Sequence, residues 1–174
     1  MKKIIVLLLA YIPFVGFSQE SAFQQELVGL LSYNESQIVM LAEAIPAEKY
    51  SWSPAQGVRS VSGVLMHIAS ANYGITAGMG FELPAGVDPT KLESITDKKK
   101  AIETVKASFA FLKEKAVLVK DANLSDKFKL PFGEFSKRQG LLILLDHAGE
   151  HKGQLIAYAR SNGVVPPWSQ AQKD

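Results

Sequence analysis

The chain contains no cysteine among its 174 residues. This absence excludes a disulfide-stabilised scaffold, a cysteine-ligated zinc finger, a thiol nucleophile and a lipid anchor on cysteine. Thiol chemistry would therefore need a thiol that arrives with a substrate or cofactor. Histidine is nearly as scarce, with three residues, so the place of each one is informative.

The chain also lacks long apolar runs, except at its beginning. Lys2 and Lys3 form a basic start, and Ile4–Phe17 is apolar. Gly16 and Ser18 are small residues, as is typical of the two key positions before a signal-peptide cleavage site. We therefore expect a secretory signal peptide cleaved near Ser18, and the alternative is an uncleaved N-terminal helix that is buried or anchors the chain.

The predicted organisation is a signal peptide over residues 1–18 and a single domain over residues 19–174, exported to the periplasm or secreted. Removing Lys2 and Lys3 brings the 19 basic side chains level with the 17 acidic ones. A neutral domain without a basic cluster is a poor partner for nucleic acid. No segment after residue 18 is apolar over the length that a bilayer requires, so we expect no membrane span in the mature form.

Apolar residues recur at helical spacing in four parts of the domain. The predicted helices span residues 20–44, 61–78, 97–120 and 137–161. Ser60, Thr96 or Asp97, and Ser136 precede the last three helices and have the side chains that N-caps favour. The predicted fold class is all-α, a four-helix bundle.

The connecting segments are rich in proline and glycine. Those over residues 47–59 and 121–135 are long for a simple up-down bundle, so periodicity leaves the order of the helices open. No stretch sustains the alternation of a strand, so we expect none. Pro166 and Pro167 are expected to prevent a further helix.

The three histidines are His67, His147 and His151. His147 and His151 are four residues apart in the fourth predicted helix, so they lie on one face about 6 Å apart along the axis. Apolar residues continue this face on both sides, and His67 lies at the edge of the apolar face of the second helix. Two helices of a bundle would therefore bring three imidazoles together, the ligand set of an open three-histidine metal site.

Three stretches are similar to one bacterial family. They are Ile45–Pro54 leading to Arg59-Ser60-Val61, Val64–Ala69 around His67, and His147–Leu155 followed by Tyr158, Arg160, Gly163 and Pro166-Pro167. Together they resemble the DinB-like superfamily of metal-binding four-helix bundles. The H-x-x-x-H-x-G-Q-L pattern with an upstream histidine is the most specific part, and the resemblance covers most of the predicted domain.

The resemblance implies that His67, His147 and His151 are the metal ligands and that crossover connections join the helices. Family members of known activity include thiol-dependent S-transferases and a thiol-dependent isomerase. By analogy the chain could form a homodimer. The family name refers to DNA-damage induction and implies no contact with DNA.

Beyond the ligands, the catalytic residues are unknown. Gln154 lies three residues after His151 and could orient a ligand or a water. Glu150 points about 100° away from His151 around the helix, as expected for a surface carboxylate or a partner of a histidine N–H. Asn34 is a polar residue on the apolar face of the first helix, where it would form either part of a pocket wall or a hydrogen-bonded core amide.

An ion held by three neutral imidazoles would activate a bound water or a bound thiol as the nucleophile. Zinc is the first expectation, and nickel, iron, copper and cobalt also accept imidazole. We therefore expect an exported metal-dependent transferase or hydrolase acting on a small electrophile. The alternatives are a non-catalytic bundle that metal staples together and a metal-free binding module.

Overall fold

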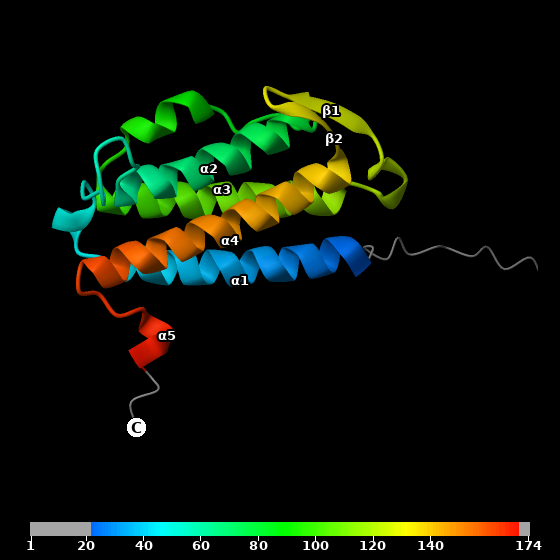
Figure 1. Ribbon diagram of the computed structural model, residues 1–174. Helices are drawn as coiled ribbons and strands as arrows, with labels where there is room; N and C mark the ends of the chain where they lie inside the picture. Colours follow the sequence, from blue (N-terminus) through cyan, green and yellow to red (C-terminus); the bar gives the residue numbers. More distant parts are fainter. Residues whose placement is uncertain (1–21, 171–174) are drawn as a thin grey trace, which may run out of the picture.

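The computed structural model describes residues 22–170, so the predicted signal peptide lies outside the described residues. Four long helices form a bundle (Figure 1). They are α1 (Ala22–Ala44), α2 (Val61–Gly78), α3 (Lys98–Leu118) and α4 (Lys137–Ser161). The predicted all-α four-helix bundle is confirmed. None of the helices in this described part is long and apolar enough to cross a membrane.

The predicted N-caps begin the last three long helices. The side chain of Ser60 accepts a hydrogen bond from the N–H of Gly63 at 3.1 Å, and Asp97 caps α3 in the same way. Ser136 and Gln139 form a reciprocal capping box at the start of α4. These local contacts fix where the helices begin, and therefore which turn carries each histidine.

Consecutive long helices are not all neighbours in the bundle. α1 packs against α3 and α4, and α2 packs against the same two helices, so α1 and α2 lie diagonally across the bundle. The long connectors make this order feasible because they cross from one corner to the opposite one. The result that matters for function is that α2 lies beside α4 (Figure 1).

The core is continuous through the bundle and consists of apolar side chains from every long helix. Its largest fully buried members include Leu31, Ile38 and Leu41 of α1, Leu65, Met66 and Ile68 of α2, Phe109 and Leu112 of α3, and Leu141 and Leu144 of α4. The first connector folds onto this core through η1 (Ala47–Lys49) and Tyr50, whose hydroxyl donates to the carbonyl of Ala42 at 2.6 Å.

The prediction that the chain has no strands is wrong. After η3 (Asp121–Asn123), strands β1 (Lys127–Leu130) and β2 (Gly133–Ser136) form an antiparallel hairpin that pairs Phe128 with Phe135. Four residues are too few for alternation to stand out in a sequence. The hairpin lies over the ends of α2 and α4, and its Phe128 is 8% exposed.

Gly140 of α4 makes room for this hairpin. A Cβ added at Gly140 would lie 2.6 Å from Cζ of Phe128, far closer than carbon atoms approach. Glycine is thus the residue that lets β1 seat against the helix. By contrast, Cβ atoms added at Gly149 and Gly153 would meet nothing within 4 Å, so no neighbouring helix explains those glycines.

Pro166 and Pro167 do not prevent a further helix, as the sequence had led us to expect. A short helix, α5 (Pro167–Gln170), follows α4. Proline is compatible with a first helical turn because the N–H that it lacks has no partner there. Trp168 of α5 packs partly against the core.

Candidate metal centre

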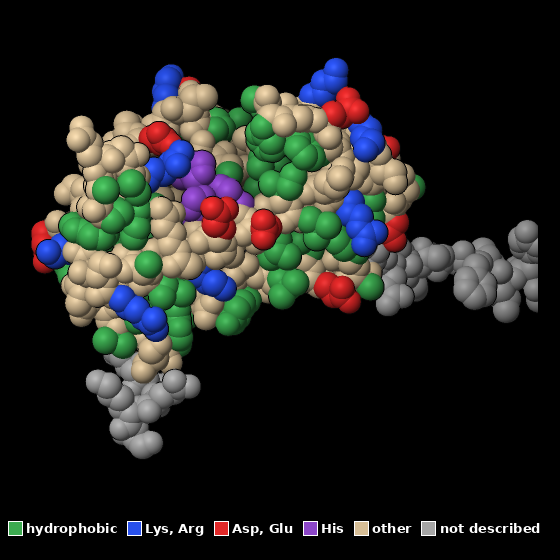
Figure 2. Space-filling model, in the orientation of Figure 1, with side chains coloured by type: hydrophobic (Ala, Val, Ile, Leu, Met, Phe, Trp, Pro, Cys, Tyr) green, Lys and Arg blue, Asp and Glu red, His purple; other side chains and the backbone are tan. Residues whose placement is uncertain are grey.

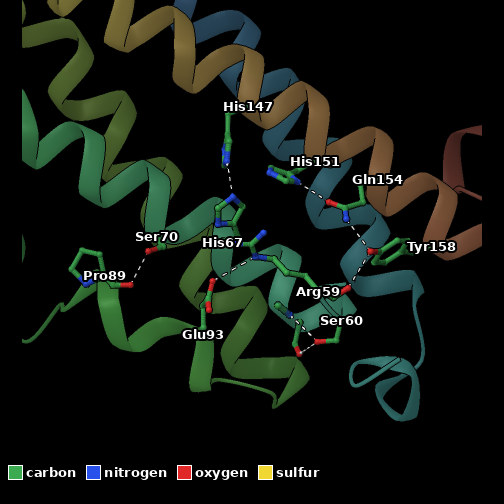
Figure 3. Close-up of polar contacts among 12 residues, drawn as sticks. Arg59, Ser60, His67, Ser70, Pro89, Glu93, His147, His151, Gln154 and Tyr158 are labelled. Atoms are coloured by element: carbon green, nitrogen blue, oxygen red, sulfur yellow. Dashed lines mark hydrogen bonds and ion pairs between the residues drawn. The ribbon is translucent and has the colours of Figure 1, made fainter. Parts of the chain in front are cut away.

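The three histidines meet between α2 and α4. His67 lies in the second turn of α2, and His147 and His151 lie on consecutive turns of α4 (Figure 3). One ring nitrogen from each lies within 4.8 Å of the others. The sequence predicted His147 and His151 on one helical face and His67 facing the same interior, and the packing of α2 beside α4 brings the three side chains together.

The distances suit a single small cation. Nε2 of His147 lies 3.1 Å from Nε2 of His67, which is less than twice the usual metal–imidazole distance of about 2.0–2.1 Å. The ring centroids of His67 and His147 lie 4.9 Å apart, and those of His147 and His151 lie 4.4 Å apart. The planes of these two pairs of rings meet at 59° and 75°, so the rings do not stack face to face.

A chain of hydrogen bonds holds His151. Its Nδ1 lies 2.7 Å from Oε1 of Gln154, and Nε2 of Gln154 donates to the hydroxyl of Tyr158 at 2.9 Å. That hydroxyl donates in turn to the carbonyl of Arg59 at 3.1 Å (Figure 3). Because Gln154 engages Nδ1, the other ring nitrogen of His151 is left to face the cluster.

Arg59 and Glu93 bring opposite charges to the same place. Nε of Arg59 lies 3.5 Å from Oε1 of Glu93, and both side chains are about half exposed. Glu93 belongs to η2 (Pro89–Ser94), which is attached to α2 because Ser70 donates to the carbonyl of Pro89 at 2.7 Å. The loop after α2 thus returns to the histidines, a contact that the sequence did not indicate.

Burial favours the neutral form of His147 and His67. Burial, and then the charges of the two other histidines and of Arg59, lower the pKa of His147 from 6.5 to about 4. The pKa of His67 is also lowered, first by burial, while the carboxylates of Glu93 and Glu150 act in the opposite direction. Neutral imidazole is the form that coordinates a metal.

This pKa shift predicts how the stability of the metal-free protein depends on pH. Above pH 6.5, His147 is neutral in both the folded and the unfolded chain. Between pH 6.5 and about 4, the unfolded chain binds a proton that the folded chain does not, so we expect the free energy of unfolding to fall as the pH falls. Urea unfolding of chelator-treated protein across this range measures the effect.

The matched variant for this experiment is His147→Asn, which cannot titrate. Its free energy of unfolding should change less between pH 6.5 and 4 than that of the wild type. An equal change in both proteins would show that other groups cause the pH dependence.

Two cavities adjoin the histidines. The first, of about 610 Å³, is polar and is lined by Arg59, Glu93, Glu150, His151 and Gln154, together with Gly57 and Val58. The second, of about 620 Å³, lies on the side of His67 and His147 and is lined mainly by apolar residues of α2, the hairpin and α4. Both sizes are typical of small-molecule sites.

The histidines are reached from the surface. Figure 2 shows their purple side chains in a hollow, with basic side chains on one side, hydrophobic ones on the hairpin side and acidic ones below. His151 is 8% exposed, and the other two are partly exposed. A small molecule could therefore approach the cluster from either cavity.

The remaining candidate residues have different surroundings. Gln154 lies against His151, as described above, and Glu150 is an exposed carboxylate at the polar cavity. Asn34 is buried between α1 and α4, where its Oδ1 accepts a hydrogen bond from Lys152 at 2.7 Å, and it lines neither cavity. Sequence reasoning gave no role to Arg59 or Glu93, because only the fold brings them to the histidines.

Comparison with known families gives a match to the model described as the DinB family, over residues 19–174. A comparison with curated protein sequences finds no match. Among solved structures, a DinB-like protein from Bacillus cereus ATCC 10987 superimposes with a TM-score of 0.69 at 20% identity, over 82% of this chain and 95% of that one.

A second similar structure is YfiT from Bacillus subtilis, with a TM-score of 0.64 at 14% identity, over 84% of this chain and 92% of that one. It is described as a probable metal-dependent hydrolase with an unusual four-helix bundle topology. A conserved protein from Enterococcus faecalis gives a TM-score of 0.61 at 17% identity, over 79% of this chain and 95% of that one. At these identities the three structures support the fold.

Proposed function

Because this chain belongs to the DinB family, we propose that it is a metal-dependent enzyme in which His67, His147 and His151 hold one divalent ion. The convergence of three ring nitrogens within 4.8 Å is the observation that carries the proposal. The hydrolase description of YfiT, a structure of the same fold, supports it.

The donor set fits such an ion. Imidazole ligands coordinate in their neutral form and supply no charge, so the ion would keep its full positive charge for a fourth partner, and burial already favours that form at His67 and His147. Zinc suits this ligand set best, and nickel, iron, copper and cobalt are alternatives. When bound, the ion would lower the pKa of a coordinated water toward 7 and polarise an electrophilic substrate.

The side chains around the histidines have their own roles in this proposal. The hydrogen bond to Gln154 fixes the orientation of the His151 ring, and therefore the direction in which the other ring nitrogen points. Glu150 and Glu93 line the polar cavity and can accept a proton from a water or a leaving group. Arg59, next to Glu93, can bind a substrate oxygen that carries negative charge.

We propose hydrolysis of a small electrophile rather than transfer to a thiol. The reason is the proposed export of the mature domain after cleavage near Ser18. Thiols are kept reduced in the cytosol, and an oxidising compartment holds few of them. Water, by contrast, is available in every compartment, and both cavities adjoin the histidines.

The test compares zinc-loaded wild type with the His147→Ala/His151→Ala variant at the same added zinc, using a panel of small esters and activated amides. We expect hydrolysis by the wild type to be at least about 100-fold faster and to rise through a pKa near 7. Addition of glutathione or 2-mercaptoethanol tests thiol transfer. If the protein binds one ion per chain but shows no turnover in either assay, the enzyme proposal is contradicted. That result would favour a structural metal that only links α2 to α4.

A further inference from the structure

The apolar cavity is built differently from the polar one. Its lining includes Gly74 of α2, Leu130 and Phe132 of the hairpin, and Ile143 of α4, and it reaches His67 and His147. Two of the three clustered histidines therefore face a mainly apolar space, while the third faces charged side chains. A molecule bound across the cluster would meet an apolar wall at one end and a polar wall at the other.

The hairpin supplies an exposed aromatic ring to this cavity. Phe132 lies in the two-residue turn between β1 and β2 and is 65% exposed. Its ring centroid lies 5.4 Å from that of Phe135, so the hairpin supports the ring from one side. When an exposed phenylalanine at the mouth of a cavity covers an apolar ligand, both lose contact with water. This burial of apolar surface lowers the free energy of the complex.

Gly74 of α2 leaves its part of the cavity wall open. A Cβ added there would meet no atom within 4 Å. Glycine weakens a helix interior, and here no close packing partner requires it. The space in front of Gly74 belongs to the cavity, so a larger side chain would occupy ligand volume rather than the core.

We infer that this cavity binds the hydrophobic part of the substrate, an alkyl or aryl group, that Gly74 leaves the room for this group and that Phe132 covers it. The inference rests on the proposed function, since it places the reacting bond at the histidines. The substrate class is then a small amphiphilic ester or amide, with its polar end beside Arg59 and Glu150. The cavity volume of about 620 Å³ is ample for such a group.

The test uses binding rather than turnover. Linear alkyl hydroxamic acids of two, four and eight carbons are titrated calorimetrically into zinc-loaded protein, since the hydroxamate group binds zinc and the chain is free to enter the cavity. We expect the affinity to rise with chain length, by up to about fourfold for each buried methylene. Gly74→Leu should abolish most of this rise, and Phe132→Ser should reduce it.

Gly29→Leu is the matched control. Gly29 is an exposed glycine of α1 that also has nothing within 4 Å of an added Cβ. Its substitution by leucine therefore changes helix propensity in the same way as Gly74→Leu does, but leaves the cavity unchanged. This variant should keep the wild-type dependence on chain length. Circular dichroism of all three variants checks that the bundle is folded.

The two proposals fail in different ways. If acetohydroxamic acid binds the zinc-loaded protein but longer chains bind no better, the open metal site stands and the hydrophobic specificity is wrong. The same holds if Gly74→Leu and Gly29→Leu give equal slopes. If no hydroxamate binds while zinc is stoichiometric, the proposed open coordination position is wrong.

Discussion

We expect the His147→Ala/His151→Ala variant to lose a divalent ion that the wild-type protein binds at about one per chain. The substitutions remove two of the three ring nitrogens that converge within 4.8 Å and leave His67 as a single ligand. One imidazole from α2 cannot retain the ion through dialysis. Elemental analysis of protein purified without a histidine tag, after reconstitution with zinc, nickel or iron, gives the stoichiometry.

The control for this experiment is a variant that keeps all three ligands. Gln154→Leu removes the hydrogen bond to Nδ1 of His151 but leaves the ring in place. It should still bind one ion, with an affinity about 10–100-fold lower, because the partner that orients the ligand is lost. A double histidine variant that retains stoichiometric ion would overturn the ligand assignment.

The second large effect concerns the hairpin. Phe128→Ala should lower the free energy of unfolding by roughly 3 kcal/mol, because it removes a buried ring and leaves a cavity. Phe128 is 8% exposed and packs so closely on α4 that Gly140 has no room for a Cβ. Urea unfolding, monitored by circular dichroism, measures the change.

The same hairpin offers a matched control. Phe132→Ala removes an identical ring that is 65% exposed, so we expect a change of less than about 0.5 kcal/mol. Equal losses in the two variants would mean that the packing of Phe128 on Gly140 is not what anchors the hairpin. Since the hairpin also forms one wall of the apolar cavity, Phe128→Ala should weaken ligand binding there as well.

Much of the secondary structure could be predicted because local chemistry decides it. Ser60, Asp97 and Ser136 accept hydrogen bonds from backbone N–H groups three residues ahead, so each cap is encoded within one turn. The hairpin was missed because four-residue strands carry too little periodicity. The contact that seats it on α4 joins Phe128 to Gly140, and this contact depends on how the hairpin folds back over the helix rather than on a local pattern.

In the candidate metal centre, too, one part follows from local sequence and another from the packing of the helices. Helical periodicity by itself places His147 and His151 on one face, since residues four apart lie one turn apart. Whether His67 joins them depends on which helices are neighbours, and α2 lies beside α4 because long connectors set α1 and α2 diagonally. In a bundle whose neighbours followed chain order, α2 and α4 would be diagonal and the three imidazoles would not meet.

The sequence by itself therefore determined the helices, their caps and the pair of histidines on α4, because these depend on residues a few positions apart. Only the tertiary structure decided that His67 completes the cluster, that Arg59 and Glu93 line a polar cavity, and that the hairpin closes an apolar one. Those features depend on packing between segments far apart in the chain, which no local pattern specifies.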